Sequence, residues 1–102
     1  MTTMIVPIRL KDGVNPADYE KWATERDIPT ATSLPSVDSF ALYKVASLID
    51  GSPAPYHYVE VIEINDIEQF PKDAGSEKMQ VIASELGQFL GDGAFLMSDR
   101  IA

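Results

Sequence analysis

The chain contains no cysteine and a single histidine, His57, among its 102 residues. Disulfides and thiolate metal sites are therefore excluded, and one histidine cannot build a multi-histidine metal site unaided. The sequence also lacks a phosphate-binding loop, a dinucleotide-binding fingerprint, a nucleophile elbow and a paired metal-ligand motif. We therefore expect a protein without bound flavin, haem or transition metal, whose stability comes from packing.

Basic residues are scarce, with 8 Lys and Arg against 16 Asp and Glu and a net charge of −8. This charge repels phosphate backbones and anionic lipid headgroups, so neither nucleic acid nor a membrane is an expected partner. The N-terminal residues 1–4 lack the basic start of a secretory signal, and no apolar run approaches the ~18 residues of a membrane span. We expect a cytoplasmic protein with one domain over residues 1–102.

The first third of the chain carries strand signals followed by helix signals. The β-branched run Met4–Leu10 predicts a strand, in which Pro7 should cause a bulge because proline cannot donate to a sheet. A helix should follow over about Pro16–Arg26 and end there, since Pro29 forbids its continuation. Residues Ile28–Ser36 then predict an ordered loop, of the kind that often borders a site.

Two strands joined by a turn come next. Val37–Leu48 and Tyr56–Ile64 are rich in β-branched and aromatic residues, and the turn-forming run Asp50–Pro53 separates them. These segments predict a long hairpin. A short turn through Asn65–Phe70 should follow and break near Pro71.

The remaining residues predict one more helix and one more strand. Ser76 can cap a helix, and Gly91–Gly93 supplies a stop and a turn before a last strand over Ala94–Ile101. One face of that helix is apolar, formed by Met79, Ile82, Ala83, Leu86 and Leu90. The resulting order, β-α-β-β-α-β, predicts an α+β, ferredoxin-like fold in which two helices cover one face of a four-stranded antiparallel sheet.

Both faces of this sheet should be mostly apolar. In the third strand His57, Val59 and Val61 share one face, and Glu60 shares the other with Tyr58, Ile62 and Ile64. Two helices can bury only one face, and monomers rarely leave a large apolar patch exposed. A second copy of the sheet is the simplest cover, so we expect a homodimer. The alternative is a monomer with a long loop over the sheet.

Three segments carry a family resemblance. The runs Thr24–Pro29, Leu34–Phe40 and Tyr56–Val61 resemble the RedY/HapK-like family of dimeric α/β-barrel proteins. The resemblance implies a homodimer whose two sheets form a barrel, often with a ligand cavity, and an association with bacterial secondary-metabolite pathways such as prodiginine biosynthesis. Relatives of this kind include cofactor-independent monooxygenases, cyclases and proteins with no known activity, so the fold does not choose among them.

His57 and Asp27 are the candidate catalytic residues. His57 is the side chain whose ordinary pKa lies near neutrality, which suits a general acid or base. Asp27 follows the first predicted helix and could orient this histidine, so we predict that the two act from one pocket. The structural alternatives are a strand histidine hydrogen-bonded near the sheet end and a helix-end carboxylate in solvent.

Strand parity separates the other candidates into two arrangements. Either His57 works with Asp27 and Trp22, or Tyr58 and Glu60 line a barrel interior between subunits. Aromatic residues on the inner stripe of the first helix are more often core than cavity wall. The candidate substrate contacts are Tyr19, Trp22, Tyr43, Tyr58 and Glu60.

Two functions fit these observations. The first is a small cofactor-independent tailoring enzyme, or enzyme-like binder, that acts by acid/base chemistry on an aromatic or polyketide-type metabolite. The second is a non-catalytic accessory protein that shelters a hydrophobic intermediate. Both need an apolar cavity with few polar groups, and a polar group with a perturbed pKa aimed into that cavity would favour the enzyme.

Overall fold

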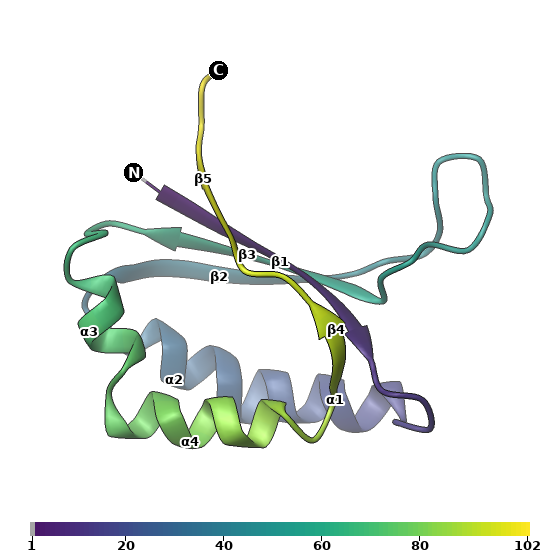
Figure 1. Cartoon of the computed structure of the whole chain (residues 1–102), viewed down its shortest axis with the longest axis horizontal. Coiled ribbons are helices and arrows are strands. Elements are labelled where there is room, and N and C mark those ends of the chain that lie inside the picture. Colours follow the sequence, from purple (N-terminus) through teal and green to yellow (C-terminus); the bar gives the residue numbers. More distant parts are fainter. Residues whose placement is uncertain (1) are drawn as a thin grey trace.

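The computed structural model describes residues 2–102; Met1, part of the N-terminal stretch considered above, lies outside this range. The described chain forms an antiparallel sheet of five strands in the order β2-β3-β1-β4, with β5 also paired to β1 and the helices on one face (Figure 1). This confirms the ferredoxin-like prediction. The elements are β1 (Thr2–Leu10), α1 (Pro16–Trp22), the π-helical turn η1 (Ala23–Asp27), α2 (Ile28–Thr32), β2 (Val37–Lys44), β3 (Tyr58–Ile64), α3 (Phe70–Ala74), α4 (Glu77–Leu86), β4 (Leu90–Gly93) and β5 (Leu96–Asp99).

The first helical segment runs past Pro29, contrary to the predicted loop. Asn15 caps α1 through its side chain, which accepts from the amide N–H of Ala17 at 3.0 Å. In η1 the N–H of Ile28 bonds the Ala23 carbonyl, five residues back, and α2 continues to Thr32. The wider turn opens the helix just before Pro29, where a regular helix would press the ring against the carbonyl four residues back. Pro29 therefore lies in the first turn of α2, directly after the π turn.

Pro7 does not create the predicted bulge. It pairs in register with Val59, and the irregularity in β1 falls between Arg9 and Leu10. The carbonyl of Pro7 accepts from Ala94, which lies between β4 and β5. Because the N and O of one residue in an antiparallel strand point to the same side, the missing N–H also faces this break. The break between β4 and β5 therefore lies opposite Pro7, which has no N–H to donate to a neighbouring strand.

The C-terminal third differs from its prediction in two places. Pro71 does not break a turn; it lies in the first turn of α3. Of the predicted last strand, Ala94–Ile101, only Leu96–Asp99 forms a strand, β5. The glycine run expected to form a turn lies instead in an additional short strand, β4. The amide N–H of Lys11 bonds the Phe89 carbonyl at 2.8 Å, which ties the end of β1 to this segment.

The two faces of the sheet are covered differently. Alternate residues of β1 face the helices and form the core with the inward residues of β3, and they are all buried: Met4, Val6, Ile8, Leu10, Tyr58, Ile62 and Ile64. The opposite face is not covered by the described chain, and the C-terminal segment extends away from it (Figure 1). Among the described residues no helix is long and apolar enough to cross a lipid bilayer.

Candidate functional site

A cavity of about 440 Å³ lies between the helix-facing side of the sheet and the helices. Phe95 and Met97 belong to its wall and are also about half exposed, so the cavity opens toward β5. Of the lining side chains only Asp27 and Glu60 are polar, and no Lys, Arg or His from residues 2–102 is among them. The apolar lining comprises Met4, Ala31, Leu34, Val37, Phe40, Ile62, Phe70, Ala74, Met79, Ile82, Ala83, Leu86, Phe95 and Met97.

The backbone explains how two acidic side chains reach this apolar space. Glu60 pairs with Val6 in the sheet and, by strand parity, points to the helix side together with Tyr58 and Ile62. Asp27 is the last residue of η1, and the inserted π turn rotates the helix so that this side chain is buried. Only 6% of Asp27 and 4% of Glu60 are exposed. Single π turns within helices occur frequently at functional sites.

The two carboxyl groups interact directly and perturb each other. Burial raises the pKa of Glu60, and the charge of Asp27 and a hydrogen bond with it raise that pKa further. Burial likewise raises the pKa of Asp27. A hydrogen bond between two carboxyl groups requires one of them to hold the proton, and adjacent carboxylates in apolar surroundings cannot both ionise readily. We therefore expect the pair to share one proton near neutral pH, so that one group can act as an acid and the other as a base.

Tyr19, a predicted ligand contact, lies beside this pair. Its side chain is fully buried, and its hydroxyl has no hydrogen-bond partner among the described residues. Burial raises the pKa of the Tyr19 phenol, and the charges of Glu60 and Asp27 add to the effect. The ring packs against Tyr58 with ring centres 4.8 Å apart. Tyr19 is thus an un-ionised phenol held close to the two carboxyl groups by aromatic packing.

The hydroxyl of Tyr58 and the indole of Trp22 are engaged away from the cavity. Tyr58 faces the helices, but its hydroxyl donates to Glu20 at 2.5 Å. Trp22 donates from Nε1 to Glu85 at 2.8 Å, and Glu85 also forms an ion pair with Arg26 at 2.6 Å. These contacts connect α1 and η1 to β3 and α4.

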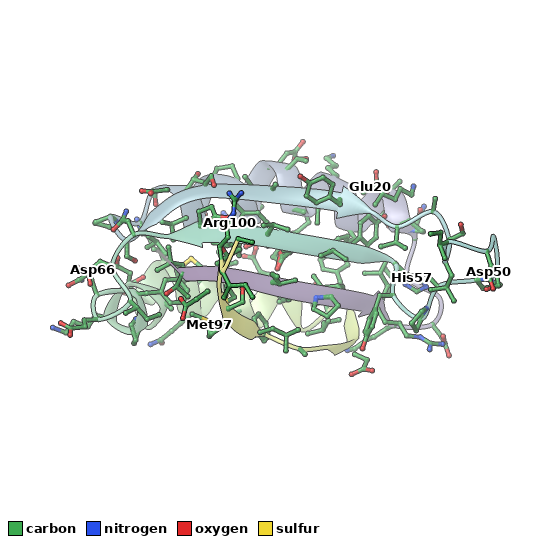
Figure 2. All side chains as sticks on the ribbon, turned by 90° about the horizontal axis from the view of Figure 1, so that it is seen from above. Glu20, Asp50, His57, Asp66, Met97 and Arg100 are labelled. Atoms are coloured by element: carbon green, nitrogen blue, oxygen red, sulfur yellow. The ribbon has the colours of Figure 1, made fainter. Side chains whose placement is uncertain are left out.

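His57 is not brought to Asp27 within the chain. The Nδ1 atom of His57 accepts from the amide N–H of Leu10 at 3.0 Å, and His57 is exposed to solvent. Figure 2 shows His57 at the end of β3 that is nearest the long loop between β2 and β3. Along the strands it is well separated from Met97, which lines the cavity. The predicted His57–Asp27 pocket is therefore not formed here, because parity and position both favour Glu60 as the partner of Asp27.

The position of the helices contradicts the other predicted arrangement. Tyr58 and Glu60 do not face the uncovered side of the sheet, where a barrel interior between subunits would lie, because both are buried under the helices. Tyr43 does lie on the uncovered side, opposite Val59, and is 59% exposed. Within the described chain it is therefore remote from the carboxyl pair.

The pairing of Asp27 with Glu60 is what sequence reasoning missed. One signal was available: Glu60 is the acidic residue among otherwise apolar positions on the core face of its strand. Buried carboxylates without a partner are costly, so such a position indicates either a cation or a function. Asp27 could not be matched to it, because the π turn that buries Asp27 leaves no recognisable pattern in the sequence. The structure shows no cluster of three or more potential metal ligands in residues 2–102.

Comparisons with known proteins agree with the fold. A family model described as REDY-like protein HapK matches residues 2–101. The crystal structure of HapK from Hahella chejuensis is 31% identical, with a TM-score of 0.80 over 99% of this chain and 93% of that one. No curated protein sequence matches the chain.

More distant structures share the fold alone. A dimeric ferredoxin-like protein of unknown function from Thermobifida fusca is 16% identical, with a TM-score of 0.74 over 95% of this chain and 88% of that one. Hydroxynitrile lyase from Passiflora edulis is 11% identical, with a TM-score of 0.79 over 95% and 90%. The family model and the similarity to HapK both extend over nearly the whole chain, and this protein is therefore a member of the REDY-like HapK family.

Proposed function

We propose that this protein binds a small hydrophobic or aromatic molecule in the cavity and transfers a proton to or from it through Asp27 and Glu60, without a bound cofactor. The observation that carries the proposal is a pair of buried carboxyl groups at an otherwise apolar cavity of about 440 Å³. Such a cavity provides affinity for an apolar ligand, while the two polar groups supply orientation and chemistry. The association of RedY-like proteins with secondary-metabolite pathways suggests a tailoring step as the setting.

A homodimer is part of this proposal. Each chain contributes a single domain, residues 1–102, to a dimeric α/β barrel. The uncovered sheet face carries Ile5, Val59 and Val61 in register across β1 and β3, with Tyr43 and Leu96 exposed beside them. The Thermobifida fusca protein of the same fold is described as dimeric, which supports the same assembly here. Light scattering after size exclusion should give twice the mass of 11.2 kDa, and Val61→Lys should shift it toward the monomer.

The catalytic part can be tested without the natural substrate. 5-Nitrobenzisoxazole opens to a coloured phenolate when a base removes the C–H proton of its isoxazole ring and the N–O bond breaks. We expect turnover by the protein to fall roughly 100-fold or more in Asp27→Asn and in Glu60→Gln, the usual range for a lost acid or base. Glu63→Gln is the matched control, because Glu63 lies on the same strand but accepts from Thr3 on the opposite face.

A second measurement separates catalysis from binding. N-phenyl-1-naphthylamine is an uncharged probe whose fluorescence rises in apolar surroundings, and Ala31→Phe should reduce its binding by filling the cavity. Probe binding without any carboxyl-dependent turnover would favour the accessory protein that shelters a hydrophobic intermediate. Absence of both would contradict the proposed function.

A further inference from the structure

The chemistry of the cavity wall restricts the ligand more narrowly than its size does. Asp27 and Glu60 are the polar groups of the wall, and the described chain places no Lys, Arg or His beside them. A carboxylate or phosphate on the ligand would enter an apolar space next to acidic groups with no cation to offset it. The overall charge of −8 opposes an anion from a distance as well. The ligand that fits is uncharged where it meets the pair.

The proton shared by Asp27 and Glu60 determines which functional groups the ligand needs. One carboxyl group presents an O–H donor and the other an acceptor that can remove a proton, and both face the same cavity. A carbonyl compound with a C–H beside the carbonyl satisfies both groups: its oxygen accepts from the protonated carboxyl, and its acidic C–H lies within reach of the ionised one. A hydrocarbon without any polar group would leave both carboxyl groups without a hydrogen-bonding partner on the ligand.

We propose that the Asp27–Glu60 pair interconverts the keto and enol forms of an uncharged cyclic or aromatic carbonyl compound held in the cavity. This proposal rests on the proposed function and names its substrate class.

The step needs no oxidant, reductant or co-reactant. The ionised carboxyl removes the proton from the carbon beside the carbonyl, the C–H electron pair becomes the C=C bond, and the carbonyl π electrons move to oxygen. The protonated carboxyl then delivers its proton to that oxygen. The product is the enol, and the pair again holds one proton, now on the other carboxyl group. The reverse sequence restores the ketone, so each cycle leaves the protein unchanged.

The test uses the full chain and 2-tetralone, an uncharged bicyclic ketone, in D₂O. NMR should show faster deuterium incorporation next to the carbonyl than in buffer, and Asp27→Asn and Glu60→Gln should each lower this rate roughly 100-fold. Glu63→Gln should retain the wild-type rate because its side chain lies on the other face of the sheet.

Competition by matched ligands adds a second measurement, which reports the ligand preference of the cavity. 2-Naphthol, an uncharged enol mimic, should inhibit the exchange, while naphthalene and the anion 2-naphthoate should inhibit it at least 10-fold more weakly. Equal inhibition by 2-naphthoate would overturn the proposal. If 5-nitrobenzisoxazole is turned over but 2-tetralone shows no carboxyl-dependent exchange, this inference fails while the proposed function stands. If neither probe reacts, both fail.

Discussion

Two buried carboxyl sites in this protein have opposite electrostatics. Asp73, on α3, accepts from the hydroxyl of Ser36 at 2.6 Å, from the Ser36 amide N–H at 3.1 Å and from the side-chain amide of Gln69 at 2.9 Å. These hydrogen bonds hold the pKa of Asp73 below its ordinary value. Asp27 and Glu60 interact with each other instead of with such donors, and burial raises the pKa of both groups.

The difference shows that burial alone does not decide what a carboxyl group does. Surrounding donors make Asp73 a fixed structural anion that fastens α3 to the segment before β2. The lack of such donors leaves the cavity pair with a proton that can move. The same comparison predicts that one chemical change, carboxyl to amide, has opposite effects at the two sites.

The largest expected effect is at the structural site. One carboxyl oxygen of Asp73 accepts from the Ser36 N–H and hydroxyl and the other accepts from Gln69, and Asp73→Asn replaces one of these two acceptors by an amide donor. Because the donors on one side of the side chain then lose their acceptor, the free energy of unfolding should fall by about 2–3 kcal/mol. Urea denaturation at neutral pH measures this loss. A change below about 0.5 kcal/mol would mean that the hydrogen bonds around Asp73 do not stabilise the fold.

The second effect is a loss of stability with rising pH. Carboxyl groups in unfolded chains have pKa values of about 4, whereas burial and the charge of Asp27 raise the pKa of Glu60 to about 8. A raised pKa means that the protonated group contributes stability fully below the unfolded pKa, and that this contribution is lost as the pH rises through the folded pKa. The free energy of unfolding should therefore fall by about 2 kcal/mol or more between about pH 5 and pH 9.

Glu60→Gln provides the control for that experiment. The amide cannot ionise, so most of the decline with pH should disappear, and the variant should be more stable than the wild type at the alkaline end. Denaturation curves for both proteins across the same pH series give the comparison. Parallel slopes would show that the pair does not share a proton as described.

A smaller effect is expected at His57. Its Nδ1 accepts from the Leu10 amide N–H, so His57→Ala should remove one hydrogen bond and lower the free energy of unfolding by about 1 kcal/mol. Turnover of 5-nitrobenzisoxazole should be retained because His57 lies outside the cavity wall. Loss of that activity in a folded His57→Ala variant would restore the histidine as a catalytic candidate.

The smallest effect concerns Tyr19. Its buried hydroxyl has no partner among the described residues, so Tyr19→Phe should leave stability unchanged or raise it by less than about 1 kcal/mol. Tyr58→Phe is the matched control, and it should be mildly destabilising because its hydroxyl donates to Glu20. Thermal unfolding of the two variants side by side tests this ordering, and a clear loss in Tyr19→Phe would reveal a hydrogen bond to that hydroxyl in solution.

The sequence by itself determined the fold class, the faces of the third predicted strand and the family. Alternation along 58–64 correctly separated Glu60 from the face of Val59 and Val61, because side-chain direction in a strand follows from residue number alone. The runs that resembled RedY-like proteins likewise depend only on local residue identity, and the family model confirms them.

The tertiary structure decided which side chains meet. Asp27 reaches Glu60 only because a π turn before Pro29 keeps the helix going and rotates that carboxylate inward, a choice that the local residues alone did not reveal. His57 accepts a hydrogen bond from the backbone N–H of Leu10, which is 47 residues away in the chain. Partners at such separations are set by how strands and helices pack, so residue types and spacing could propose the candidates but not join them.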